Sequence, residues 1–253
     1  MNRWRQFMLV LSLLGAVFAV SGPTASPILA QVGGGACAHG NNVGSNACRN
    51  GAYSEVYTGA YASWTSKNMY LDQAHYNEGW HINQEMWFYT RTDENQWVEL
   101  GERNGQAIGG DPCGTCLAYE VFWADFDSVG AEHAHYIANT TPDGVGHNYE
   151  IWGNGDKTWN VYYDGNYAGM STNQPSALGY EDEVGSEISC CAQPWSHSDT
   201  FDFTSLLTRD QNGSWTSWPY VNTWIDAPCG GYPQGSCLNG VAPNTSEWLN
   251  NKP

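Results

Sequence analysis

The chain has 253 residues, with 26 acidic side chains against nine lysines and arginines, for a net charge of −17. This excess of negative charge excludes nucleic acid as a partner, because phosphates require a basic surface, and it equally excludes an anionic membrane surface. The length suits a single β-sandwich domain that buries its own core.

Residues 1–30 have the features of a secretory signal peptide. Arg3 and Arg5 form a short basic region, and an apolar run from Phe7 to Val20 is too short to span a membrane comfortably. Cleavage is expected after Ala30; an uncleaved membrane anchor is the alternative. The mature chain then has seven basic and 26 acidic residues, a net charge of −19, and is expected to be extracellular without membrane contact. Such a charge fits an acidic habitat, and it also fits a secreted protein that is acidic for solubility.

All eight cysteines follow this segment, and an even number after a signal peptide predicts structural disulfides. The full pairing is not deducible, but Cys37–Cys48 and Cys229–Cys237 would each close a short Gly-rich loop. The Cys113-Gly-Thr-Cys116 motif has no second Cys-x-x-Cys beside it and no βαβ pattern around it, so a disulfide is favoured over a zinc or redox site.

Along the chain, residues 31–51 form a Gly/Asn-rich lead-in and residues 52–190 carry a β pattern. Residues 191–253 are rich in Cys, Pro and Gly, and we expect them to wrap the same domain with few strands. Alternating runs rich in aromatic and β-branched residues predict strands. These runs are 81–90, 96–103, 117–127, 133–140, 148–152, 158–163, 166–171 and 180–188.

Two turns separate the later runs. Asp164-Gly165 predicts a tight hairpin, because Gly tolerates the positive φ of a type I′ turn, and residues 153–156 predict another turn. Short strands at roughly ten-residue spacing without a helical period predict an all-β sandwich or jelly roll with disulfide-pinned loops.

The run 96–103 has a carboxylate on its polar face. Val98 and Leu100 share one face and are the natural core contacts. Glu99 then points out of the sandwich, beside a Trp97 that we expect to be exposed.

The run 180–188 has the same pattern. Tyr180, Val184 and Ile188 share one face, and the other carries the carboxylates of Glu181, Glu183 and Glu187, with Gly185 leaving space between two of them. Like charges this close raise at least one pKa, as an acid/base pair requires. The alternative is ordinary polar patterning on a half-exposed strand.

Three stretches resemble the glutamic peptidases, meaning the eqolisins and the neprosin-type enzymes. They are Gln-Trp-Val-Glu-Leu-Gly at 96–101, the hairpin 149–169 with its Tyr-Tyr-Asp-Gly, and the run 180–188. The resemblance covers roughly residues 80–190 and implies a concanavalin-like double-sheet fold with the active site on the concave sheet. It implies Glu99 at the first catalytic position and Glu183 or Glu187 at the second. The Met-Gly-Ser-Gly stretch expected in neprosin-type domains is absent.

The resemblance also implies a mechanism without a cofactor. One ionised Glu would deprotonate a water for attack on a peptide carbonyl, and the other, protonated, would stabilise the oxyanion and protonate the leaving amine. Trp97 and Trp123 would line the substrate site, and the optimum would lie at acid pH.

Other functions remain open on the same fold. Twelve tryptophans in the mature chain suit a carbohydrate-binding, lectin-like module, and paired carboxylates suit a glycoside hydrolase, so the partner is a polypeptide or a polysaccharide. A metal site at His133, His135 and His147 is disfavoured, because such surface histidines are more often unliganded. A serine triad lacks a Gly-x-Ser-x-Gly motif. Whether Trp and Tyr gather on the face of Glu99 or turn inward discriminates between a binding module and core packing.

Overall fold

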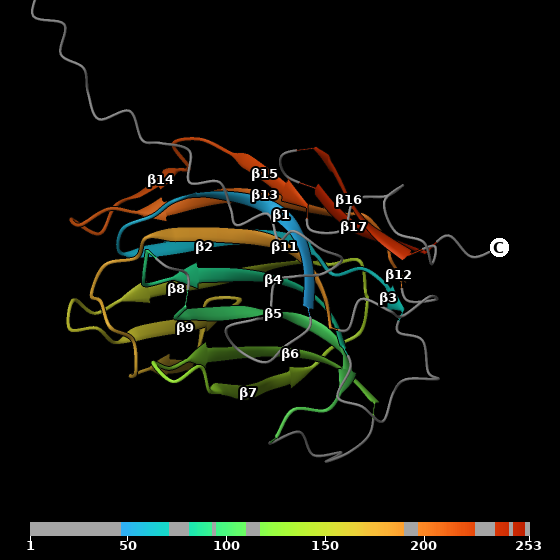
Figure 1. Ribbon diagram of the computed structural model, residues 1–253, viewed down its shortest axis with the longest axis horizontal. Helices are drawn as coiled ribbons and strands as arrows, with labels where there is room; N and C mark the ends of the chain where they lie inside the picture. Colours follow the sequence, from blue (N-terminus) through green and yellow to red (C-terminus); the bar gives the residue numbers. More distant parts are fainter. Residues whose placement is uncertain are drawn as a thin grey trace, which may run out of the picture. The chain divides into compact units, whose positions relative to one another are not determined.

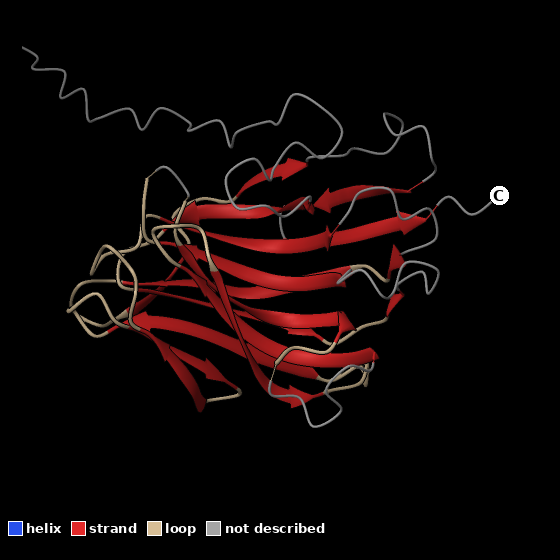
Figure 2. Cartoon of the chain, turned by 60° about the horizontal axis from the view of Figure 1, so that its bottom comes forward, coloured by secondary structure: helices blue, strands red, loops and turns tan. Residues whose placement is uncertain are grey.

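The computed structural model describes residues 47–70, 81–92, 95–109, 117–189, 197–225, 236–242 and 245–250. Figure 2 shows only strands and loops in these residues. No helix among them is long and apolar enough to cross a membrane.

Most strands belong to two antiparallel sheets (Figure 1). The first, sheet A, has seven strands in the order β15-β1-β11-β4-β5-β6-β7. Its strands are β1 (Ala47–Glu55), β4 (His81–Tyr89), β5 (Trp97–Gln106), β6 (Leu117–Phe126), β7 (Glu132–Asn139), β11 (Glu181–Ser189) and β15 (Asn222–Ile225). The order places β11 beside β4, although these strands lie far apart in the sequence.

The second, sheet B, has the order β10-β9-β8-β2-β13-β17-β16, and β14 pairs with β13. Its strands are β2 (Gly59–Thr65), β8 (Gly146–Gly153), β9 (Trp159–Tyr163), β10 (Asn166–Ser171), β13 (Phe201–Arg209), β14 (Trp215–Ser217), β16 (Ser236–Ala242) and β17 (Thr245–Asn250). Two short strands, β3 (Met69–Tyr70) and β12 (His197–Ser198), pair separately. The expected all-β, double-sheet sandwich is confirmed.

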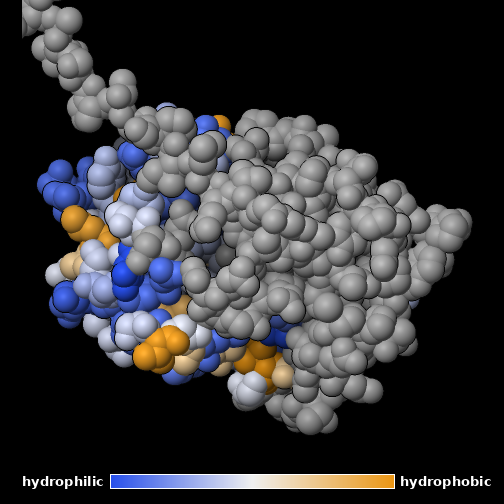
Figure 3. Space-filling model, in the orientation of Figure 1, coloured by the Kyte–Doolittle hydropathy of each residue, from blue (hydrophilic) through white to orange (hydrophobic). Residues whose placement is uncertain are grey.

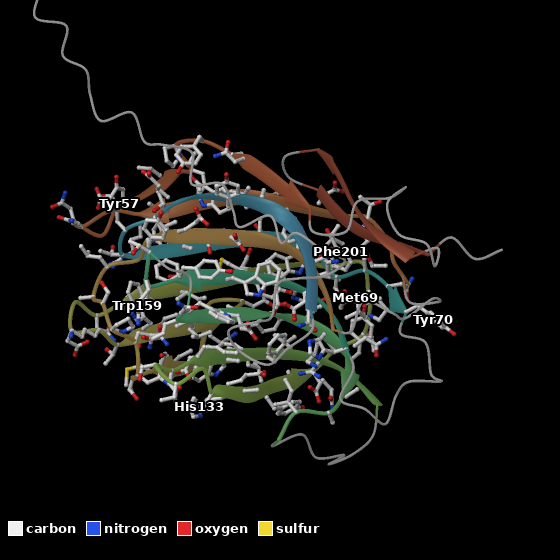
Figure 4. All side chains as sticks on the ribbon, in the orientation of Figure 1. Tyr57, Met69, Tyr70, His133, Trp159 and Phe201 are labelled. Atoms are coloured by element: carbon white, nitrogen blue, oxygen red, sulfur yellow. The ribbon has the colours of Figure 1, made fainter. Side chains whose placement is uncertain are left out.

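The core combines apolar side chains from both sheets, which is where the alternation of each strand directs them. Trp64 of β2 stacks on Tyr149 of β8, with ring centroids 3.4 Å apart and 4° between the planes. Trp159 and Phe201, labelled in Figure 4, are fully buried in this core. Large hydrophobic residues at the surface are few and scattered, and in the coloured part of Figure 3 they form small separate patches.

The eight strands expected between 81 and 188 are present, with ends that differ by at most three residues. The hairpin turn is also confirmed, because Asp164 and Gly165 have φ values of 49° and 72° between β9 and β10. The second turn, at 153–156, joins β8 to β9 and contains Gly155 at φ 85°.

The structure adds strands on both sides of that range. The sequence pattern does not predict β2, because its inward residues include the small Ala60 and Ala62. The described residues between 197 and 250 contain six strands instead of few, and β13 is nine residues long. The positive φ of Ser205 and a register shift between Thr204 and Leu207 interrupt its alternation, which weakens the sequence pattern.

Several expectations lie outside the described residues. They are the signal peptide at 1–30, most of the lead-in, and the side chains of all eight cysteines. The disulfides and the secretion therefore stay predictions.

Candidate active site

The candidate site lies on the face of sheet A that is turned away from the core, here called the outer face. Val98 and Leu100 of β5 belong to the core between the sheets, so Glu99 lies on the opposite, outer face, as the alternation predicts. In an antiparallel sheet, directly paired residues share a face, so the register identifies the neighbours of Glu99.

One row of paired residues brings two of the expected catalytic groups together. Glu183 of β11 pairs with Trp87 of β4, and Trp87 pairs with Glu99 of β5. The two glutamates therefore flank Trp87 on the same face. Since neighbouring strands lie about 4.8 Å apart, their Cα atoms are separated by about 10 Å, and their side chains can converge above the indole.

Each of these two carboxylates accepts a hydrogen bond from an aromatic side chain of the same face. Trp97 Nε1–H donates to Glu99 Oε2 at 2.7 Å, and Tyr89 O–H donates to Glu183 Oε2 at 3.1 Å. Trp97 stacks on Phe126 with ring centroids 3.8 Å apart, and Trp87, Tyr89, Trp97 and Phe126 form one cluster. Packed rings thus hold both donors in place.

Burial is the main difference from expectation. The exposed fraction is 6 % for Glu99, 4 % for Glu183 and 4 % for Trp97, so the expectation of an exposed Trp97 is wrong. Its ring is covered by the aromatic cluster, where a large apolar surface is removed from water. Buried carboxylates need hydrogen-bond donors, and the indole of Trp97 and the hydroxyl of Tyr89 supply them.

A third carboxylate, Glu85 of β4, occupies the next row and was missed as a site residue. It pairs with Gly185 on one side and Gly101 on the other, and Asn83 Nδ2–H donates to its Oε1 at 3.1 Å. A Cβ at Gly101 would collide with the backbone oxygen of Gln84 and the Cβ of Glu85, so this glycine allows the close approach of β4. The alternation of His-Ile-Asn-Gln-Glu-Met-Trp at 81–87 was the available signal.

Glu187 lies farther from Glu99 than Glu183 does. It pairs with Asn83, two rows from Trp87, and its Oε1 lies 3.3 Å from His81 Nε2. The register therefore separates the two alternatives for the second glutamate, which the sequence left open.

Trp123 does not lie on the outer face. It pairs with Leu100, belongs to the core cluster, and stacks on His135 with ring centroids 4.0 Å apart. Gly169 of sheet B leaves room for its ring, because a Cβ there would lie 2.6 Å from ring atoms. The structure thus brings Trp97 to Glu99 but directs Trp123 into the core.

The three histidines considered for a metal site are dispersed. On sheet A, His133 lies 3.2 Å from Asp127, and His135 stacks on Trp123. His147 lies on sheet B, where it contacts Asp164 at 2.7 Å. Over the described ranges, no group of three His, Cys, Asp or Glu side chains could hold a metal ion.

Several solved structures have a fold similar to that of this chain. Scytalido-glutamic peptidase with a transition-state analog inhibitor superposes with a TM-score of 0.51 and 9 % identity, covering 81 % of this chain and 99 % of the other. The fold resembles that of a glutamic peptidase. A second complex of this peptidase, with a peptide-based transition-state analog, gives 0.51 and 9 %, covering 80 % and 98 %. An eqolisin, SCP-B in complex with a tripeptide, gives 0.40 and 12 %, covering 81 % and 99 %. No protein-family description and no curated protein matches the sequence. At these identities the likeness concerns the fold alone.

Proposed function

We propose that this chain is a secreted, acid-active peptidase of the glutamic type, in which Glu99 and Glu183 form the catalytic pair. The observation that supports it most is the row Glu183–Trp87–Glu99, which puts two buried carboxylates on one face, each with an aromatic hydrogen-bond donor. The fold likeness to scytalido-glutamic peptidase supports the same class.

The donors favour different roles for the two glutamates. An indole N–H can only donate, so the Trp97 contact favours the ionised form of Glu99. A phenol can donate or accept, so Tyr89 suits Glu183 whether it is protonated or ionised. We assign Glu99 as the base that deprotonates the attacking water and Glu183 as the acid that binds the oxyanion and then protonates the leaving amine.

The direct test is digestion of a denatured protein by purified mature chain between about pH 2.5 and 7, the range around ordinary carboxyl pKa values. Wild type should cleave only on the acid side, and Glu99→Gln should lose this activity while remaining folded. Glu150→Gln, the same change on sheet B, is the matched control and should cleave like wild type. A well-folded wild type that cleaves at no pH contradicts the peptidase proposal.

A carbohydrate-binding module is the second candidate, and the outer face of sheet B favours it. Five partly or largely exposed aromatic residues gather there: Tyr61, Trp152, Tyr162, Tyr167 and Trp215. Trp152 and Tyr162 stack with centroids 5.5 Å apart, and Arg209 lies 4.9 Å above the Trp152 ring. Exposed rings with nearby charged groups suit sugar binding, whereas the aromatic residues near Glu99 are buried.

Pull-down with insoluble polysaccharides tests this second candidate. Wild type should bind at least one of them, and Tyr167→Ala combined with Trp215→Ala should weaken binding, whereas Tyr57→Ala should not. Retention of the double variant at the wild-type level contradicts the role of this face.

A further inference from the structure

Arg103 is a buried cation on the same face as the proposed catalytic pair. It lies four residues after Glu99 on β5, with Gly101 between them on the same side of the strand. Only 7 % of its surface is exposed. Burial lowers the pKa of this guanidinium, and the nearby charges of Glu120, Glu132, Glu85 and Glu99 act in the opposite direction. A cation this buried ordinarily has direct partners.

The guanidinium makes no hydrogen bond and no ion pair within the described part of the chain, and its Nε is buried without an acceptor. Three of the four carboxylates around it are engaged elsewhere. Glu120 accepts from the Ile108 N–H at 3.1 Å with both oxygens, Glu85 accepts from Asn83, and Glu99 accepts from Trp97. A buried, unpaired donor group of this kind calls for a partner that binds from outside.

The position of the side chain suits such a partner. The guanidinium carbon lies 5.7 Å from the centre of the Phe122 ring, and Phe122 pairs with Gly101, one pair closer to Glu99 than Arg103 itself. Stacking on a ring uses the face of the guanidinium and leaves its N–H edges available for a planar anion. The apolar cluster of Ile108, Phe122 and Ala124 adjoins it, and a low-dielectric surface on that side strengthens such an ion pair.

We propose that Arg103 binds a carboxylate of the peptide substrate and thereby selects peptides that carry a carboxylate at that position. This proposal rests on the proposed peptidase function of the same face. The Gly101 position lies two residues from Glu99, which is about 7 Å along a strand, so the carboxylate belongs two or three residues from the scissile bond of an extended peptide. It is either the C-terminal carboxylate or an acidic side chain, and both offer two oxygens to the guanidinium.

The test measures binding without turnover, by titration calorimetry at pH 5 in the Glu99→Gln background. Three probes are used: N-acetyl-tetraalanine with a free C-terminus, its carboxamide, and the carboxamide with one alanine replaced by glutamate. At least one carboxylate probe should bind about tenfold more tightly than the neutral carboxamide, the lower range for a charge-assisted bidentate contact. The better of the two identifies which carboxylate is recognised.

The variants then assign this preference to Arg103. Adding Arg103→Gln should abolish the preference for carboxylate probes. Arg103→Lys keeps the charge but loses the two-pronged hydrogen-bonding geometry of the guanidinium, so it should reduce the preference to a few-fold. This second variant also provides the test if Arg103→Gln does not fold. Arg209→Gln, which removes a cation from sheet B, should keep it. Equal binding of all probes, no binding of any, or a preference that survives Arg103→Gln overturns the proposal.

The outcome is separable from the peptidase question. A carboxylate preference in a protein that cleaves nothing would retain the Arg103 site and remove the peptidase function. If wild type cleaves peptides but shows no preference for carboxylate probes, the peptidase function is retained and the Arg103 site is removed.

Discussion

Both faces of sheet A carry buried carboxylates, but the hydrogen bonds to these groups differ between the outer face and the inner face, which is turned toward the core. On the outer face, Glu99, Glu183 and Glu85 each accept a hydrogen bond from a neighbouring side chain. On the inner face, Glu102 accepts from Tyr149 and Ser66, yet burial still raises its pKa. Asp182 has both oxygens buried without any hydrogen-bond partner among the described residues, and burial raises its pKa well above the ordinary value.

This contrast indicates two uses of an acidic group. A fixed donor lowers the pKa of a buried carboxyl and so favours the ionised form that a base needs, although at Glu102 burial outweighs the two donors. A buried carboxyl without a donor, such as Asp182, avoids the cost of burying a charge by keeping its proton. The same strand, β11, contains both kinds at adjacent positions, Asp182 and Glu183, because successive side chains alternate between faces.

The largest expected effect separates Glu183 from Glu187 on the outer face. Glu183→Gln should lower the rate of peptide cleavage by about 10²- to 10⁴-fold, the range for losing a general acid or base. Glu187→Gln, its matched control on the same strand and face, should stay within a few-fold of wild type, because it lies two rows from Trp87. Measurement of kcat/KM at acid pH checks this, and an equal loss in both variants contradicts the assignment.

The second effect concerns stability on the inner face. Because the pKa of Asp182 is raised in the folded protein, its contribution to stability is complete below the unfolded pKa of about 3.9 and is lost as the pH rises through the folded pKa. Glu102 acts in the same direction. The Tm of wild type should therefore fall between pH 3.5 and 7.5, and Asp182→Asn should make this fall shallower. The exposed Asp202→Asn is the control, and parallel curves for Asp182→Asn and wild type would exclude the explanation.

A third, smaller effect tests the close approach of β4 to β5 at Gly101. Gly101→Ala should destabilise the fold by about 1–3 kcal/mol, because the added Cβ collides with β4. Gly109→Ala, where nothing lies within 4 Å of the added Cβ, should be close to neutral. Chemical denaturation gives both values. If the two variants are equally stable, Gly101 is not a close-contact position.

The smallest effect concerns the donor to Glu99. Trp97→Phe keeps an aromatic ring but removes the N–H, and it should lower kcat/KM by about tenfold, as expected for one hydrogen bond to a charged group. The acidic limb of the pH profile should shift as well, because an ionised base loses a stabilising contact. An unchanged profile would show that the indole serves only packing.

Much of the fold follows from alternation, which is local. The strands between 81 and 188 and the Asp164-Gly165 turn were predictable, because period-2 patterns and turn residues act over a few positions. β13 was not, since the positive φ of Ser205 interrupts its pattern. Trp123 was misplaced for another reason: an aromatic residue in a strand fits either face, and only its register with Leu100 assigns it to the core.

The sequence by itself determined the all-β class and the face of each strand that carries its carboxylates, because side chains alternate along a strand whatever its partners are. Only the tertiary structure decided that β11 lies beside β4, and hence that Glu183 and not Glu187 shares a row with Glu99. It also decided that this face is buried and that Arg103 is unpaired there among the described residues. Strand order and register depend on contacts between distant segments, and no local pattern encodes them.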